Sequence, residues 1–131
     1  MFEFLKSGIN QTKLKLFDSD YDFLRQNMSI EDQLKVYRLM RDDYQKIMAI
    51  AESGSFNQNQ DVKQMAVKAM QSRNTASAQW KDKRNPNWMA AALIENFCNA
   101  ILSGDMKLFY HVYVRIGGWV SALEQLDQEG R

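Results

Sequence analysis

The chain has 131 residues, of which 45% are hydrophobic and 25% are charged, and its formal net charge at pH 7 is +1. This length suits one compact domain, and this composition is typical of a globular protein rather than a disordered one. A net charge near zero excludes a surface that is basic or acidic throughout, so any electrostatic function must be local.

The first 28 residues have the weakest pattern of the chain. We expect 1–28 to be an irregular segment that packs on the rest of the domain, with a small hairpin or two short helices formed by FEFLK and KLKLF. Apolar residues at its start could touch a bilayer, but one or two turns of apolar contact bind weakly. No apolar run approaches the ~18 residues of a membrane span. We therefore predict no stable membrane association.

Three amphipathic helices are predicted in the middle of the chain. From Ser29 to Gly54, apolar residues recur at three- and four-residue steps, and these two residues suit the N-cap and the stop. A second helix, which could fray around 74–75, runs over 62–80. A third follows Asn85, which can cap a first turn that begins with Pro86.

The run MKLFYHVYVRI, over 106–116, is apolar nearly all round, which predicts a helix at the centre of a bundle. It also alternates like a strand, but no convincing partner strand lies nearby. Gly117 and Gly118 either break or kink this helix, and the apolar residues that stay in phase across them favour one kinked helix. The predicted fold is all-α: a compact bundle of about four to six helices in a single domain, 1–131.

The acidic stretch DSDYD, from Asp18 to Asp22, has the alternating carboxylates that open a calcium loop. Such a loop then needs glycine where Phe23 stands and glutamate where Ser29 stands. Helix capping and solvation are therefore the better interpretation of these carboxylates, and we expect no metal site.

His111 is the only histidine and lies in the most apolar helix, so we interpret it as a packed ring bonded to a neighbouring group rather than a catalytic base. Cys98 is the only cysteine, and it lies in an apolar run where a small buried side chain is expected. A lone cysteine cannot form an internal disulfide, which favours a cytoplasmic protein. An enzyme that uses Cys98 or His111 is the weakest of the functional hypotheses, and we expect no cofactor and no catalytic activity.

Residues 62–84 carry six basic residues and one acidic residue, an uneven charge that would suit an anionic partner. The first three basic residues are spaced five apart, which scatters them around a helix. Only Lys81, Lys83 and Arg84, within QWKDKRNPNW, stay together, and three phosphate contacts give little affinity at cellular salt. The flanking Trp80 and Trp88 are predicted to anchor this connection to the core.

These observations favour a small intracellular protein-binding module or regulator that acts through protein–protein contacts. Lys81, Lys83 and Arg84 are the candidate partner-binding residues. The alternative is a nucleic-acid-binding regulator that uses the basic loop 81–84. Short helical domains often complete their cores by pairing, so the sequence leaves both a homodimer and a monomer open.

Overall fold

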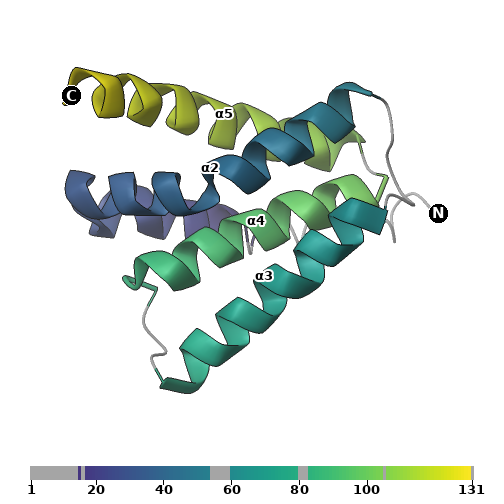
Figure 1. The fold of residues 1–131 in the computed structure, drawn as a ribbon, viewed down its shortest axis with the longest axis horizontal. Helices are drawn as coiled ribbons and strands as arrows, with labels where there is room; N and C mark the ends of the chain where they lie inside the picture. Colours follow the sequence, from purple (N-terminus) through teal and green to yellow (C-terminus); the bar gives the residue numbers. More distant parts are fainter. Residues whose placement is uncertain (1–14, 16, 54–59, 80–82, 105, 131) are drawn as a thin grey trace.

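The fold is an all-α bundle, as predicted. The structure is a computed structural model that describes residue 15 and residues 17–53, 60–79, 83–104 and 106–130. These ranges contain no strand; the backbone is helical over 17–27 and in α2 (Ile30–Glu52), α3 (Gln60–Gln79), α4 (Pro86–Leu102) and α5 (Met106–Glu129). Figure 1 shows α3 and α5 on opposite sides of α4.

The boundaries of the helices follow from local capping. The Ser29 hydroxyl accepts a hydrogen bond from the Asp32 backbone N–H at 3.1 Å, and α2 begins at the next residue. The Asn85 side chain accepts from the backbone N–H of residue 87 at 3.0 Å, and Pro86 occupies the first position of α4. Gly104 ends the segment after α4 with φ of 69°, a conformation that favours glycine. The backbone of α3 continues helical through 74–75, where we expected fraying.

The central helix is α4, so the prediction that 106–116 lies at the centre is wrong. Ten residues of α4 are buried, and this helix contacts α2, α3 and α5. Its alanines at 90–92 allow neighbouring helices to approach closely, which makes nearly every side of it suitable for packing. By contrast, α5 buries one face and leaves Tyr110 67% exposed and Val114 50% exposed.

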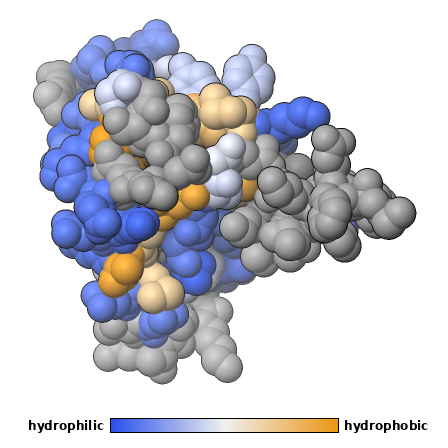
Figure 2. Space-filling view, turned by 90° about the vertical axis from the view of Figure 1, so that its right-hand side faces the viewer, coloured by the Kyte–Doolittle hydropathy of each residue, from blue (hydrophilic) through white to orange (hydrophobic). Residues whose placement is uncertain are grey.

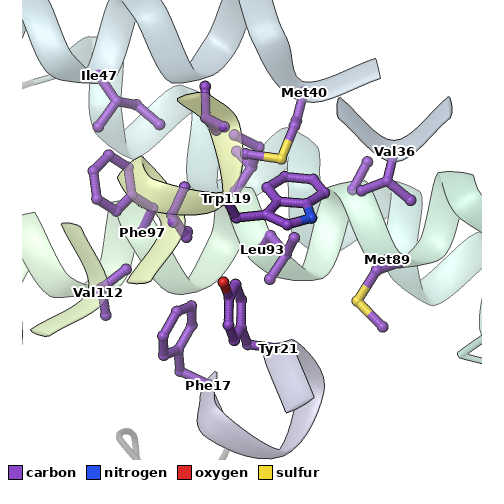
Figure 3. Close-up of a cluster of buried hydrophobic side chains, with 14 of the residues drawn as sticks. Phe17, Tyr21, Val36, Met40, Ile47, Met89, Leu93, Phe97, Val112 and Trp119 are labelled. Carbon is purple, nitrogen blue, oxygen red and sulfur yellow. The ribbon is translucent and has the colours of Figure 1, made fainter. Parts of the chain in front are cut away.

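Trp119, which the sequence analysis did not single out, is fully buried in the core (Figure 3). Its indole N–H donates to the Gln33 side-chain oxygen at 3.1 Å, and the Gln33 amide donates to the backbone oxygen of Met28 at 3.0 Å. Trp88 packs against the core from the first turn of α4, as predicted, whereas Trp80 lies outside the described residues. Trp119 therefore anchors α5 in the core, because its indole is buried and its N–H has a buried acceptor.

The segment over 17–27 is a helix, although we expected 1–28 to be irregular. Phe17, Tyr21, Leu24 and Met28 are buried at steps of four, three and four residues, so this helix contributes one apolar face to the core. The Tyr21 hydroxyl also donates to the backbone oxygen of Arg115 on α5 at 3.1 Å. The hairpin or short helices expected over 1–17 fall almost entirely outside the described residues.

The last helix crosses the two adjacent glycines without interruption, from Met106 to Glu129. This result confirms the prediction of one long helix, which rested on the phase of the apolar residues. Ile116, Val120 and Leu123 are all buried, so both halves of α5 present the same face to the core.

Candidate functional site

The structure describes two of the three candidate partner-binding residues, Lys83 and Arg84. Lys83 Nζ lies 3.0 Å from the buried Asp20 carboxylate and 5.9 Å from the centre of the Phe23 ring. Lys83 therefore holds the helix at 17–27 against the rest of the bundle. Arg84 is exposed, and Lys81 lies outside the described residues.

The carboxylates of DSDYD bind cations of the same chain. Asp18 lies 2.8 Å from the His111 ring nitrogen Nε2, and Asp22 lies 2.6 Å from a terminal nitrogen of Arg115. The Arg115 guanidinium also lies 4.7 Å from the centre of the Tyr21 ring. Within the described ranges, no group of three or more His, Cys, Asp or Glu side chains could hold a metal ion. These side chains connect the helix at 17–27 to α5, a role that we did not predict from the sequence.

The two candidate reactive side chains lie in different settings. The His111 ring is bonded to Asp18 and meets the Phe17 ring edge-on, which confirms the interpretation of a packed ring with a polar partner. Cys98 is fully buried on α4, and burial, followed by the carboxylates of Asp43 and Glu95, raises the pKa of its thiol to about 12. Cys98 is therefore an uncharged thiol at neutral pH, and a thiol is a poor nucleophile.

A groove between α2 and α3 was not predicted from the sequence. Figure 1 shows these two helices diverging from the end where they are joined, with α4 lying between them. Two hollows, of about 300 Å³ and about 520 Å³, follow one another along this opening and share Asp43 and Lys68 in their linings. We refer to both hollows together as the α2–α3 groove.

One face of each of three helices lines the α2–α3 groove. The α2 residues are at positions 39, 40, 43, 46, 49 and 50, and those of α3 are at 61, 64, 65, 68, 69 and 72; both sets recur with the three- and four-residue spacing of a helical face. The two sets run in opposite directions along the groove. Residue 39 of α2 and residue 72 of α3 line the same hollow, and residues 50 and 61 line the other. Residues 87, 90, 91 and 94 of α4 line the half that begins at 39.

The groove combines an apolar floor with a charged rim. Its apolar lining residues are Leu39, Met40, Ala49, Ile50, Met65, Ala69, Ala90, Ala91 and Ile94. Asp43 and Lys46 on α2 and Asp61 and Lys68 on α3 supply two negative and two positive charges. Figure 2, a view onto the end where α2 finishes and α3 begins, shows small hydrophobic areas among hydrophilic ones. The described lining contains neither histidine nor cysteine.

Leu39 is the residue in this groove for which the sequence contains a signal. It is 51% exposed, although its neighbours Tyr37 and Met40 on the apolar stripe of α2 are buried. A large apolar residue outside the apolar stripe of an amphipathic helix does not face the core of its own domain. This signal could have indicated a contact surface on α2, but not its partner helices.

Comparisons with known proteins give no relative for this chain: no family model, no curated protein and no solved structure matches it. None of the helices in the ranges given above is long and apolar enough to cross a membrane. Any functional inference must therefore rest on the groove and on the surfaces of the helices.

Proposed function

We propose that the protein is a small cytoplasmic protein-binding module without catalytic activity, and that the α2–α3 groove receives an amphipathic helix of a partner protein. The observation that carries this proposal is the groove itself, in which faces of α2, α3 and α4 form one apolar channel with exposed Leu39 at its edge. An amphipathic helix that lays its apolar face into a hydrophobic groove is a recurring mode of peptide recognition.

The dimensions of the groove support a helical occupant. The lining of α2 extends from residue 39 to residue 50, which at about 1.5 Å per residue gives a channel of roughly 16 Å, or three helical turns. A partner helix of this length could place apolar side chains at the first, fourth or fifth, and eighth positions over the floor. Methionines such as Met65 adapt their shape readily to a new neighbour.

The charges on the rim support a protein rather than a nucleic acid as the occupant. Asp43 and Lys46 on one wall, and Asp61 and Lys68 on the other, add up to no net charge. A partner helix with both acidic and basic side chains beside its apolar stripe complements such a rim. A phosphate backbone would be repelled by half of these groups.

The nucleic-acid alternative has weaker support. It requires the cations of the loop 81–84 to reach phosphates, but Lys83 is engaged with the buried Asp20 carboxylate. Withdrawing Lys83 would leave a buried negative charge without its partner, and such a charge is costly.

Affinity capture from the host tests the proposal, using tagged wild-type protein and two matched variants in nuclease-treated extract. Leu39→Glu places a charge in the groove, whereas Val67→Glu changes an equally exposed apolar residue (48% against 51%) that does not line it. Far-UV circular dichroism verifies that both variants fold.

We expect wild type and Val67→Glu to retain the same proteins and Leu39→Glu to lose them. The proposal is wrong if Leu39→Glu retains these proteins as well as wild type does. It is also wrong if all binding disappears on nuclease treatment, since nucleic acid would then be the ligand.

A further inference from the structure

The first half of α5 exposes a set of large apolar side chains on one side. Met106, Tyr110, Tyr113 and Val114 are at least one-third exposed, and three of them are spaced by four residues. Side chains four apart on a helix form a continuous ridge. Monomeric proteins rarely expose contiguous apolar areas of this kind without a partner.

The same ridge continues into Gly118 and the exposed Ala122. Glycine is the poorest helix former after proline, so a glycine within α5 requires a reason. A Cβ atom added at Gly118 would meet nothing within 4 Å, and one added at Gly117 would meet the Tyr44 hydroxyl at 3.5 Å, an ordinary contact. Both glycines lack a positive φ, since Gly104 is the described glycine that has one. Neither packing against the described residues nor backbone geometry therefore explains Gly118.

We propose that the partner at this face is a second copy of the chain, packed antiparallel through α5 about a two-fold axis at Val114. The ridge at 106, 110, 114, 118 and 122 decreases in size from methionine and tyrosine, through valine, to glycine and alanine. An antiparallel pair centred on Val114 sets Tyr110 of each copy opposite Gly118 of the other, and Met106 opposite Ala122. The bulky end of each ridge then fills the recess at the small end of the other, and every contact occurs twice, as two-fold symmetry requires.

The charges along α5 support the same orientation. The exposed Lys107 lies in the first turn, and the exposed Glu124 and Glu129 lie in the second half of the helix. Antiparallel packing brings the positive end of one helix to the negative end of the other, whereas parallel packing would set like charges together. Antiparallel helices also oppose their dipoles favourably.

This interface is independent of the α2–α3 groove. None of the lining residues of the groove belongs to α5, and Figure 1 shows α5 and α3 on opposite sides of α4. The inference therefore goes beyond the proposed function, and each can fail without the other.

Sedimentation equilibrium of the full chain over a wide range of concentrations tests the dimer. We expect a reversible dimer for wild type and at least about a tenfold rise in its dissociation constant for Gly118→Leu, which fills the recess. The space around Gly118 means that the fold should tolerate the leucine. Tyr110→Ser should weaken the dimer similarly, and Val67→Ser, which changes an exposed apolar residue on α3, should leave it intact.

Cysteine cross-linking is a second test, which depends on the position of the two-fold axis rather than on the affinity of the dimer. Val114→Cys should form a disulfide between two copies on mild oxidation, while Leu126→Cys should not, and the buried Cys98 is common to both variants. The inference is overturned if wild type is a monomer at every concentration, if Gly118→Leu dimerises as tightly as wild type, or if both cysteine variants cross-link equally. The groove variant Leu39→Glu should remain a dimer, which separates a failure of this inference from a failure of the proposed function.

Discussion

At the scale of single residues, burial and the charge of Arg73 act in opposite directions on the pKa of Glu95. Its side chain is 14% exposed; one carboxylate oxygen accepts a hydrogen bond from Arg73 at 3.1 Å, and the other lies 2.9 Å from the same guanidinium. Burial raises the pKa of Glu95, the Arg73 charge acts in the opposite direction, and the Asp20 carboxylate raises the pKa further. The ion pair therefore offsets only part of the cost of removing this carboxylate from water.

The raised pKa of Glu95 predicts the sign of a pH effect on stability. An acid whose pKa is higher in the folded state binds its proton more tightly there, so its contribution to the free energy of unfolding falls as pH rises from about 4.3, the usual glutamate pKa, through the folded value. Glu95→Gln removes this titration. We expect its stability relative to wild type, from urea unfolding at a series of pH values, to increase towards neutral pH.

The interpretation fails if wild type gains stability relative to Glu95→Gln as pH rises, because Arg73 would then outweigh burial.

This pair also shows what the sequence can predict at single positions. By helical periodicity, Arg73 falls on the apolar stripe of its helix and Glu95 falls on a polar face. The structure joins the two side chains between α3 and α4, across 22 positions of sequence. Periodicity describes each helix alone, so it cannot show that an arginine on one apolar stripe and a glutamate on the next helix neutralise each other.

At the scale of helices, the N-cap of α2 gives a test that depends on one hydrogen bond. Ser29→Ala removes the acceptor of the Asp32 backbone N–H and should lower the free energy of unfolding by about 1 kcal/mol. Ser29→Asp keeps an acceptor and should retain most of the stability. Thermal unfolding followed by circular dichroism measures both; equal losses would mean that the hydroxyl does not act as the cap.

The N-terminal boundaries of α2 and α4 could be predicted because caps are local in sequence, whereas Gly54, the predicted stop of α2, lies outside the described residues. Which helix lies at the centre of the bundle could not be predicted. The exposed apolar residues of α5 are of the same types as those on a buried helix face. Met106, Tyr110 and Val114 were therefore assigned to the centre of the bundle, a position that α4 occupies. The α2–α3 groove was missed for a similar reason: the angle between two helices is set by the side chains that separate them and not by the pattern of either helix.

At the scale of the whole molecule, α4 lies between two separate surfaces, the α2–α3 groove and the exposed ridge of α5. Its alanines and Ile94 form part of the floor of the α2–α3 groove, and another side of it packs on α5, whose outer ridge is exposed. A dimer formed through α5 would hold two grooves in one particle. Two linked sites raise the apparent affinity for a partner that is itself multivalent.

The central claim is that a partner protein lies in the α2–α3 groove, and site-specific photo-cross-linking in the host tests it most directly. A photoreactive phenylalanine analogue replaces Leu39 at the edge of the groove, or Val67 and Leu126 at exposed apolar positions outside it. The account predicts a discrete covalent adduct larger than the chain, resistant to nuclease, from position 39 and not from positions 67 or 126. No adduct from position 39, or the same adduct from all three positions, would contradict it.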